Sequence, residues 1–430
     1  MSYYRLQTID EQEDMNNDFQ GYLHNDVETT RVETITRRRP RRCGRKCRVC
    51  CRFFFSFTTV VILSIATWIL IAVYKKRPMI IYQHTLWSSG DNGVNTYRIP
   101  LLIATPKGTL VAAAEARKTS SKDDGQKYLV IRRSIDQGWT WQSETKLLTD
   151  ERYTDCLIHL GALLVNSRNG SIGLFYSICE NQHDSCHIFT LMFKSSFDDG
   201  YSWEKAINVS HQIGPGVFTI GPGYAIEKKY PPFIGRLIVC GHGNTQYGET
   251  FCLLSDDNGE TWRKGGIMRS IPYGSDSSYR DFFPDESQVV ELPDGSIFAI
   301  IRNERHYKCF CRITALSFDG GESFASDSIR LVKKLPDSAV SAGLLWHGGQ
   351  LIYSSPGGRI LRQTLTLKRS DDYGVSWPKS TVLWPLFSSY SAMTSFSNST
   401  SEYIYLVYEK GYLWGYSSIE FMIIDLSMLN

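Results

Sequence analysis

Ser134-Ile-Asp-Gln-Gly-Trp-Thr-Trp141 is the stretch that decides the fold, because its pattern, Ser-x-Asp-x-Gly-x-Ser/Thr-aromatic, returns four more times. The five copies begin 62, 59, 62 and 53 residues apart, at Ser134, Ser196, Ser255, Ser317 and Ser370. In each copy the Asp is suited to accept backbone hydrogen bonds, the Gly permits a positive φ, and the aromatic residue anchors the turn. One copy alone would be an ordinary surface turn. Five copies, flanked by apolar runs such as residues 128–131 and 251–254, indicate an all-β fold built from the blades of a β-propeller.

Charge is distributed unevenly along the 430 residues, although the whole chain has a net charge of only +3. Residues 1–52 contain 11 basic and 8 acidic residues, and residues 75–77 are all basic. The remaining 33 basic and 36 acidic residues give residues 78–430 a net charge of −3. This mildly acidic region does not favour a nucleic-acid partner.

The first eighty residues divide into three segments. Residues 1–36 are polar and acidic, so we expect disorder, and residues 37–52 hold nine Lys/Arg and no acid. Residues 53–74 carry no charge and would be about 33 Å long as a helix, which matches a bilayer core of about 30 Å. The basic run before this segment predicts a type II membrane protein, with residues 75–94 as a stalk and the globular part lumenal or extracellular. For residues 53–74 the alternative is a buried helix of a soluble protein. For residues 37–52 the alternative is a nuclear-localisation or nucleic-acid-binding segment.

Cysteines and sequons add hypotheses about modification. S-palmitoylation is the hypothesis for four cysteines beside the uncharged segment, Cys43, Cys47, Cys50 and Cys51. Seven cysteines follow that segment, and disulfides are expected in an oxidising compartment, with at least one cysteine left over. Cys179 and Cys186 flank a polar turn and would close a hairpin; a metal cluster with His183 and His187 is the less favoured alternative. N-glycan acceptor sequons begin at Asn169, Asn208 and Asn398.

Arginines interrupt short apolar stretches at three separate places, which are Arg98, Arg302 and Arg362. A side chain that faces the channel of a propeller is expected to be small or apolar unless it binds something. Three arginines that converge on this axis would repel one another unless an anion lies between them. A carboxylate suits this position, because guanidinium groups bind it bidentately.

The sequence Tyr97-Arg98-Ile99-Pro100, followed by five Asp boxes, resembles the exo-α-sialidase (neuraminidase) superfamily. Longer runs are most similar to its animal lysosomal branch: residues 115–118, 132–138, 236–243, 284–286 and 408–411. The resemblance covers about residues 95–412 and implies a six-bladed propeller over residues 95–430. It also implies hydrolysis of terminal sialic acids from glycoproteins, oligosaccharides and gangliosides, with retention through a tyrosyl-enzyme intermediate and without a metal or other cofactor. Phe324 departs from the pattern, since the fourth box usually ends in Trp.

The resemblance assigns roles residue by residue. Substrate-binding arginines are Arg98, Arg302 and Arg362, with Arg117 as an auxiliary. Catalytic roles fall on Asp123 as acid and base, Tyr390 as nucleophile and Glu286 beside it, with Glu115 and Glu409 as supporting acids. A neutral tyrosine suits a substrate whose anomeric carbon bears its own carboxylate, because an acidic nucleophile would be repelled. Glu286 would take the phenol proton, and an Asp123 that ionises near pH 4 implies an acidic optimum.

Two other functions share parts of this pattern. A non-enzymatic Asp-box propeller would keep the boxes but lose the arginines and the tyrosine. A trans-sialidase would use the same core but prefer a galactoside acceptor over water. By resemblance, the lysosome is the first expected location and the plasma membrane the second, with a lysosomal carboxypeptidase (protective protein) as a candidate partner.

Overall fold

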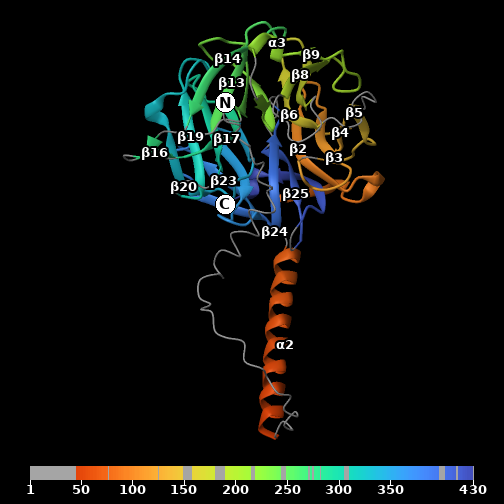
Figure 1. Cartoon of the computed structure of the whole chain (residues 1–430). Coiled ribbons are helices and arrows are strands. Elements are labelled where there is room, and N and C mark those ends of the chain that lie inside the picture. The colour runs from red at the N-terminus through yellow and green to blue at the C-terminus, as the bar shows by residue number, and fades with distance from the viewer. Residues whose placement is uncertain are drawn as a thin grey trace, which may run out of the picture. The chain divides into compact units, whose positions relative to one another are not determined.

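A computed structural model gives the structure of the chain. It describes residues 45–75, 77–123, 125–148, 157–179, 189–214, 218–243, 248–269, 272–273, 276–280, 282–304, 309–396, 402–412 and 415–429. The chain divides into two compact units, Met1–Lys76 and Arg77–Asn430. The first unit contains a 30-residue helix, α2 (Arg45–Tyr74), and the second is built mostly from β-strands (Figure 1). The predicted mostly-β fold is therefore confirmed.

The predicted membrane segment requires a correction. Within the described part of the chain, no helix combines the length and apolarity that a bilayer crossing demands. The prediction of a span over residues 53–74 is therefore wrong, and so is the single-pass type II location in the lysosomal or plasma membrane. Cys43 and the expected disorder of residues 1–36 lie outside the described residues, and palmitoylation stays a prediction.

A seven-stranded sheet joins the two ends of the globular unit. Its seven strands, in spatial order, are β1 (Ile80–Ser88), β26 (Ser418–Asp425), β25 (Tyr403–Lys410), β24 (Lys379–Thr394), β23 (Gln363–Ser370), β22 (Gln350–Pro356) and β21 (Gly343–His347). The long strand β24 pairs with β23 through its first part and with β25 through its last part. The first strand, β1, pairs antiparallel with the last, β26, so the beginning and end of the unit are hydrogen-bonded together.

Two four-stranded sheets keep their strands in chain order. One consists of β2 (Thr96–Ala104), β3 (Leu110–Arg117), β4 (Lys127–Ser134) and β5 (Thr145–Leu148). The other consists of β17 (Pro284–Glu291), β18 (Ile297–Asn303), β19 (Cys311–Ser317) and β20 (Arg330–Pro336). Both are antiparallel throughout, as expected for strands joined by short turns.

A parallel pair of strands joins the remaining strands into one larger sheet. Its strands are β6 (Leu157–Asn166), β7 (Ser171–Cys179), β8 (Phe189–Ser196), β9 (Ile207–Asn208), β10 (Phe218–Ile220), β11 (Gly223–Glu227), β12 (Leu237–Gly243), β13 (Glu249–Ser255) and β14 (Arg263–Arg269). The parallel pair is β6 with β11. A short ribbon, β15 (Pro272–Tyr273) with β16 (Asp276–Arg280), and a four-residue helix, α3 (Ser210–Ile213), complete the unit.

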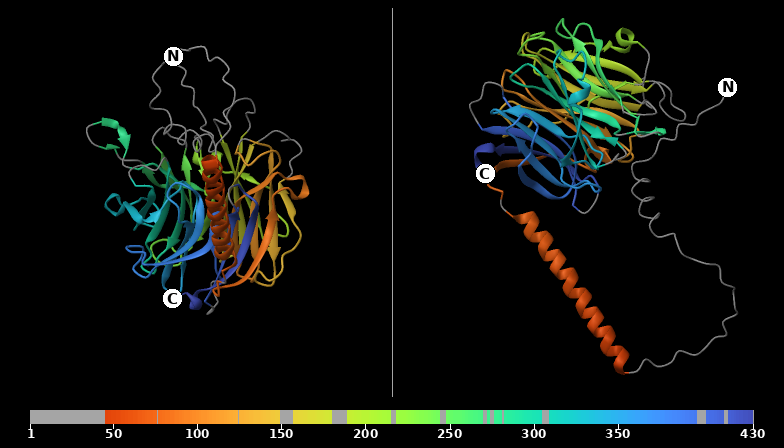
Figure 2. Two further views of the ribbon diagram at one scale, coloured as in Figure 1. Left: turned by 90° about the horizontal axis from the view of Figure 1, so that it is seen from below. Right: turned by 90° about the vertical axis from the view of Figure 1, so that its left-hand side faces the viewer.

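The sheets of the globular unit follow one another around a common centre. Figure 1 shows the order from the orange strands β2–β4 through the green β13 and β14 to the blue β24 and β25, which return beside β2. The two further views of the same unit show the sheets arranged around this centre (Figure 2). This arrangement is a β-propeller, as the Asp boxes predict.

All five Asp boxes adopt the predicted turn. In the first, Asp136 accepts hydrogen bonds from the backbone N–H and the hydroxyl of Thr140, at 2.9 and 2.6 Å. The Ser134 hydroxyl donates to Asp136 and accepts from the backbone N–H of Gly138, whose φ of 96° an L side chain rarely adopts. The same bonds recur in the other four boxes.

The box aromatics pack between neighbouring sheets. Trp141 meets Phe421 of β26 edge-on at 5.0 Å, and Trp262 meets Phe175 of β7 at 4.8 Å. Apolar clusters of this kind each join two adjacent sheets, such as the cluster shared by the β2–β5 sheet and strands β25 and β26. The core is therefore a ring of sheet-to-sheet contacts, and it leaves the inner ends of the strands available for polar side chains.

Two disulfides confirm the expectation of cysteine pairing. Cys240 and Cys252 are directly opposed on β12 and β13, and Cys309 bonds Cys311 across one residue. The proposed hairpin closure by Cys179 and Cys186 and its metal alternative lie outside the described residues, as does the sequon at Asn398. Asn169 is exposed and Asn208 is half-buried, and glycosylation of both stays a prediction.

Candidate active site

Tyr390, Glu286 and Arg302 form a closed triangle of hydrogen bonds. The Tyr390 hydroxyl donates to Oε1 of Glu286 at 2.5 Å. Nη1 of Arg302 donates to Oε2 of Glu286 at 3.0 Å and to the Tyr390 hydroxyl at 2.9 Å. All three residues are buried, and they come from strands β24, β17 and β18. The arrangement pairs a phenol with a base and places a cation beside both.

Burial dominates the ionisation of Glu286. Removal from water raises the pKa of Glu286, and the positive charge of Arg302 only partly opposes this rise. A carboxylate with a raised pKa is a stronger base than an ordinary glutamate. Its partner atom is the Tyr390 hydroxyl, so the proton that this base can accept is the phenolic one.

The three predicted arginines surround the Tyr390 side chain. The guanidinium carbons of Arg98 and Arg362 lie 5.3 and 5.8 Å from the Tyr390 ring centroid, and Arg302 binds the hydroxyl. Arg98 belongs to β2, whereas Arg362 lies in the loop that precedes β23, not on a strand as its apolar neighbours suggest. Two cations from separate sheets and a third from the loop between β22 and β23 therefore converge on one side chain, which is the geometry expected of an anion site.

Glu409 fixes two parts of the site at once. Its Oε1 accepts from Nε of Arg98 at 3.1 Å and from the backbone N–H of Ile99 at 2.9 Å. Its Oε2 accepts from the backbone N–H of Tyr390 at 3.2 Å. Glu409 is fully buried on β25, so this carboxylate ties Arg98 and Tyr390 to a single strand. The predicted supporting role of Glu409 thus has a direct geometric basis.

Irregular strand pairing sets the direction of the key side chains. The pairing of β2 with β3 shifts between Arg98 and Leu101, and Ile99 there has φ of 58°. A β-branched residue in this region costs about 1–3 kcal/mol, so other contacts must hold it there. Similar shifts enclose Glu286 and Tyr390, between Pro284 and Ser287 and between Ser388 and Ser391. Such bulges re-aim side chains, and they occur often beside active sites.

Asp123 lies in the turn between β3 and β4 and is paired with Arg117. Its Oδ1 contacts Nη2 of Arg117, and its side chain is 52% exposed. Burial of the neighbourhood opposes ionisation, but the positive charges of Arg117, Arg98 and Lys127 outweigh it and hold the pKa of Asp123 well below its usual range. The sequence-based premise of an Asp123 with an ordinary pKa is therefore wrong for this conformation, because Arg117 stabilises the carboxylate.

Glu115 binds Arg117, the partner of Asp123. Its Oε2 accepts from Nε and Nη2 of Arg117, at 3.0 and 2.8 Å, and its Oε1 accepts from the backbone N–H of Leu160. Burial alone would raise the pKa of Glu115, but the charges of Lys127 and Arg117 lower it to about 2. The carbonyl oxygen of Ser121 receives donors from both Arg117 and Arg98, which links this group of residues to the arginines around Tyr390.

Several neighbouring residues were not predicted from the sequence. Tyr416 lies under Arg98, with its ring centroid 4.1 Å from the guanidinium carbon, and its hydroxyl accepts from Arg362 at 3.2 Å. Glu304 forms an ion pair with Arg302. Lys127 and His159 border Glu115. In the sequence, Lys127 and His159 are single polar residues in or beside apolar strand patterns, and this could have marked them as candidates. Nothing distinguished Tyr416 from other loop tyrosines.

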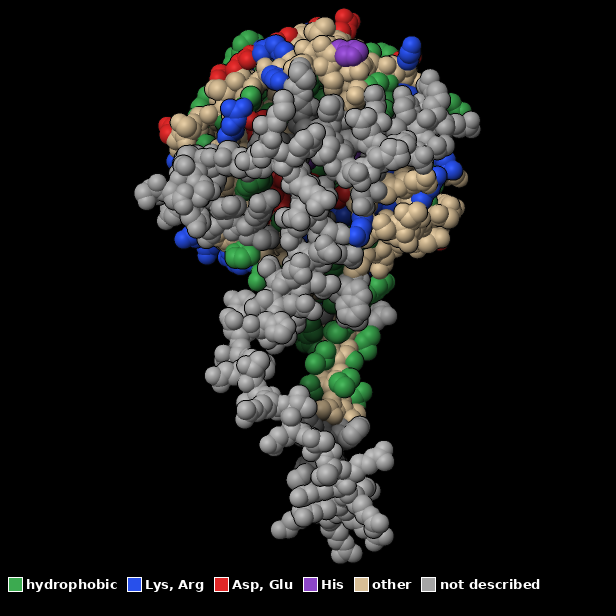
Figure 3. Space-filling view, viewed as in Figure 1, with side chains coloured by type: hydrophobic (Ala, Val, Ile, Leu, Met, Phe, Trp, Pro, Cys, Tyr) green, Lys and Arg blue, Asp and Glu red, His purple; other side chains and the backbone are tan. Residues whose placement is uncertain are grey.

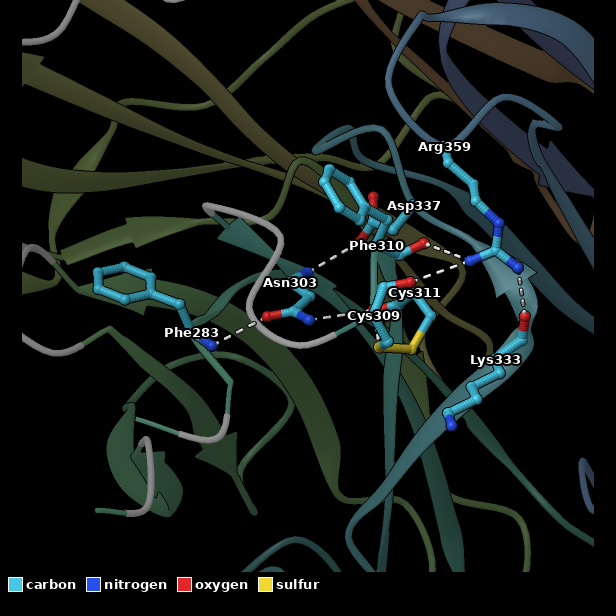
Figure 4. Close-up of a disulfide and its surroundings, with 8 residues drawn as sticks. All are labelled: Phe283, Asn303, Cys309, Phe310, Cys311, Lys333, Asp337 and Arg359. Atoms are coloured by element: carbon cyan, nitrogen blue, oxygen red, sulfur yellow. Dashed lines mark hydrogen bonds between the residues drawn. A yellow bond between two sulfur atoms is a disulfide. The ribbon is translucent and has the colours of Figure 1, made fainter. Parts of the chain in front are cut away.

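The strand end that carries Arg302 is fixed by the Cys309–Cys311 segment. Asn303 donates to the Cys311 carbonyl oxygen at 3.2 Å, and its backbone N–H donates to Asp337 at 2.8 Å (Figure 4). Arg359 donates to the carbonyl oxygens of Cys309 and Lys333 in the same view. Arg359 thus joins the loop that carries Arg362 to the Cys309–Cys311 segment, which contacts Asn303 beside Arg302. Acidic and basic side chains are both visible near the middle of the face shown in Figure 3.

Comparisons with known proteins give the family of the chain and several relatives. Residues 108–405 match the model of the BNR repeat-like domain family. The chain is 27% identical over 353 residues to a sialidase of Micromonospora viridifaciens, which covers 75% of this chain and 51% of that protein. It is 26% identical over 276 residues to Sialidase-4 of Homo sapiens, which covers 57% of this chain and 52% of that protein. The chain thus spans about half the length of these curated relatives.

Solved structures show the same fold. A Hadza microbial sialidase superposes with a TM-score of 0.68 at 22% sequence identity, over 81% of this chain and 69% of that chain. A leech intramolecular trans-sialidase superposes with a TM-score of 0.66 at 18% identity, over 81% of this chain and 71% of that chain. Because the family model matches well over half of the sequence, the chain belongs to the BNR-repeat sialidase superfamily.

Proposed function

We propose that this protein is an exo-α-sialidase that hydrolyses terminal sialic acids from glycoconjugates, with retention, through a tyrosyl-enzyme intermediate. The observation that carries the proposal is the hydrogen-bonded triangle of Tyr390, Glu286 and Arg302, surrounded by Arg98 and Arg362. Sequence similarity to sialidases supports the proposal independently of the site geometry. We also propose a six-bladed propeller, because the strands fall into six antiparallel sets, β2–β5, β6–β9, β11–β14, β17–β20, β21–β24, and β24–β26 with β1.

Substrate binding is assigned to the arginines. The carboxylate of the sialic acid would lie between Arg98, Arg302 and Arg362, whose positive charges otherwise repel one another. This position brings the anomeric carbon toward the Tyr390 hydroxyl. An acidic nucleophile would be repelled by the substrate's own carboxylate, and a phenol avoids this repulsion.

The first chemical step uses the triangle. Glu286 takes the phenolic proton while Tyr390 forms a bond to the anomeric carbon, and Arg302 stabilises the charge that develops on the phenolic oxygen. Asp123 gives a proton to the departing glycosidic oxygen and then takes one from the attacking water. The bound substrate carboxylate offsets the cations that lower the pKa of Asp123, which makes the protonated form accessible in the complex.

Turnover of a fluorogenic α-sialoside by the purified full-length chain, between pH 4 and 7, tests the proposal. The wild type should release the fluorophore, and proton NMR should show the α-anomer of sialic acid as the first product. Tyr390→Phe should reduce turnover by at least about 10³-fold, because no nucleophilic oxygen remains. Tyr405→Phe is the matched control, since Tyr405 is a buried tyrosine of the apolar cluster between sheets. Full activity of Tyr390→Phe, or a β-anomer as first product, would contradict the proposal.

A further inference from the structure

Lys127 is a buried cation in a position that the proposed chemistry does not use. Its side chain is 0% exposed at the start of β4. Nζ donates to the backbone carbonyl oxygen of Asp123 at 2.9 Å, contacts Oε2 of Glu115 at 3.3 Å, and lies 3.2 Å from Nδ1 of His159. A lysine ammonium is costly to bury unless it is paired and hydrogen-bonded, and these partners satisfy that requirement.

The protonation state of His159 follows from this contact. Burial and the neighbouring charge of Lys127 lower the pKa of His159 to about 3, so the ring is neutral at the pH of the proposed assay. An ammonium group has only donors, so Nδ1 of His159 accepts the hydrogen bond and Nε2 carries the ring proton. The ring also meets Phe189 edge-on at 5.3 Å, which fixes its orientation. His159 therefore accepts a hydrogen bond from the Lys127 ammonium group without adding a second charge.

Arg117 and Lys127 contact different parts of Asp123, and both also contact the buried carboxylate of Glu115. Arg117 pairs with the Asp123 side chain, and Lys127 binds its backbone carbonyl oxygen. Both cations also contact Oε2 of Glu115, whose side chain is 2% exposed. Movement of the Asp123 turn would break the bond to Lys127 and leave a buried ammonium with one partner fewer. The position of the turn and the charge of the buried group are thus coupled.

We infer that Lys127 is a positioning residue for Asp123, which fixes the backbone of the acid/base turn and, through its charge, favours the carboxylate form of Asp123. The inference rests on the proposed function, because it deepens the role of Asp123 within that reaction. The groups that face the Asp123 carboxyl are Arg117, Arg98, Lys127 and His159, with the acidic Glu115 behind the first cation. Of these, Lys127 binds the backbone carbonyl oxygen of Asp123 itself as well as the shared carboxylate, whereas Arg117 binds the carbonyl oxygen of Ser121.

The charge of Lys127 affects the two half-reactions in opposite directions. Protonation of the leaving oxygen requires Asp123 to carry a proton, and a nearby cation disfavours that state. Activation of water in the second half-reaction requires the carboxylate, which the same cation favours. Removal of the Lys127 charge should therefore extend activity to higher pH, since Asp123 then keeps its proton longer. Loss of the backbone bond should lower kcat at every pH, because the acid is less well placed.

The test compares pH profiles of kcat/KM for the full-length chain and for Lys127→Met, which removes the charge but keeps most of the side-chain volume. Lys228→Met is the matched control, because Lys228 is equally buried and is paired with Glu291 at 2.6 Å outside the site. We expect the descending alkaline limb to move upward by about 1 pH unit in Lys127→Met, with kcat reduced about 10-fold. Lys228→Met should lower the melting temperature without moving that limb.

An unmoved alkaline limb in a folded, active Lys127→Met protein would overturn the inference, and so would an equal shift in Lys228→Met. If Lys127→Met does not yield folded protein, Lys127→Gln tests the alkaline limb, because it removes the charge; it keeps a donor for the Asp123 carbonyl oxygen, so its kcat should fall less. An inactive wild-type protein would instead contradict the proposed function itself. Wild-type turnover with an unchanged variant profile contradicts only the role of Lys127.

Discussion

The hydroxyl group of Tyr390 lies 2.5 Å from Oε1 of Glu286, although the two residues are 104 positions apart in the sequence. Strands β24 and β17 belong to different sheets, so only closure of the propeller brings this phenol to this base. Bulges at Glu286 and Tyr390 turn both side chains toward the shared position. The pairing of Tyr390 with Glu286 is therefore a product of the whole fold and not of a local motif.

Glu286→Gln tests the base. The amide cannot accept the phenolic proton, so we expect kcat to fall by about 10²- to 10⁴-fold with a smaller change in KM. Glu322→Gln is the control, because Glu322 pairs with Arg236 and Arg263 and contacts none of the site residues described above. Steady-state kinetics with a fluorogenic α-sialoside measure both variants. A Glu286→Gln enzyme with wild-type kcat would remove Glu286 from the mechanism.

Arg362→Lys tests the carboxylate site. Arg362 is held by the Ala339 carbonyl oxygen at 2.6 Å and by the Tyr416 hydroxyl at 3.2 Å, which leaves its planar group facing the Tyr390 ring. A lysine keeps the charge but loses the bidentate geometry, so KM should rise about 10-fold while kcat changes little. Arg330→Lys, an exposed strand arginine, should leave both constants unchanged. A wild-type KM in Arg362→Lys would argue against carboxylate binding there.

The Asp boxes could be predicted from the sequence because each one is closed by contacts within eight residues. The Asp257 bonds to Ser255 and Thr261 span at most four positions, so the motif carries its own geometry. The burial of Trp262 follows from the same motif. The arginines were assigned through resemblance, and their convergence on Tyr390 is a property of the ring.

The remaining site features depend on pairing between distant strands. The bulge at Ile99 is defined by the register against β3, and the Lys127–His159 contact joins strands 32 positions apart. A sequence pattern does not encode these registers. The Arg117–Asp123 pair was equally hidden, because an aspartate in a polar turn is normally solvated and keeps its ordinary pKa.

Asp257→Ala tests the contribution of one Asp box to stability. The change removes three hydrogen bonds, from the Ser255 hydroxyl and from the backbone and hydroxyl of Thr261. We expect the free energy of unfolding to fall by about 1–3 kcal/mol, with KM unchanged, since the box lies at a sheet corner. Urea unfolding measures this change. Asp371→Ala should cost at most about 1 kcal/mol, because its pair with Lys379 is exposed.

Glu115→Gln tests the pH dependence of stability. The pKa of Glu115 is lowered from 4.5 to about 2, so its ionisation stabilises the folded state above pH 4.5 and this contribution is lost as the pH falls toward 2. The difference corresponds to roughly 3 kcal/mol at most. Glu115→Gln should be less stable at pH 7 and should lose less stability on acidification, as followed by melting temperature against pH. Glu227→Gln, an acceptor for Ser167, should keep the wild-type slope.

Tyr416 links two of the site arginines, and its two contacts can be separated by mutation. Its ring lies under Arg98 at 4.1 Å, and its hydroxyl accepts from Arg362 at 3.2 Å. Tyr416→Phe keeps the ring and removes the hydroxyl bond, so we expect KM to rise about 3- to 10-fold, which corresponds to one neutral-to-charged hydrogen bond. Tyr416→Ala also removes the cation–π contact, so its KM should rise further, by about another 3-fold or more.

The control for these variants is Tyr412, an exposed tyrosine of the same segment that packs on Trp384. Tyr412→Phe and Tyr412→Ala should leave KM unchanged. Equal KM values for Tyr416→Phe and the wild type would show that the hydroxyl bond does not order Arg362 for binding. Equal effects of Tyr416→Phe and Tyr416→Ala would show that the ring contributes nothing beyond its hydroxyl. A graded increase from Phe to Ala is the expected result, because Tyr416→Phe removes the contact to Arg362 alone and Tyr416→Ala removes the contacts to both Arg362 and Arg98.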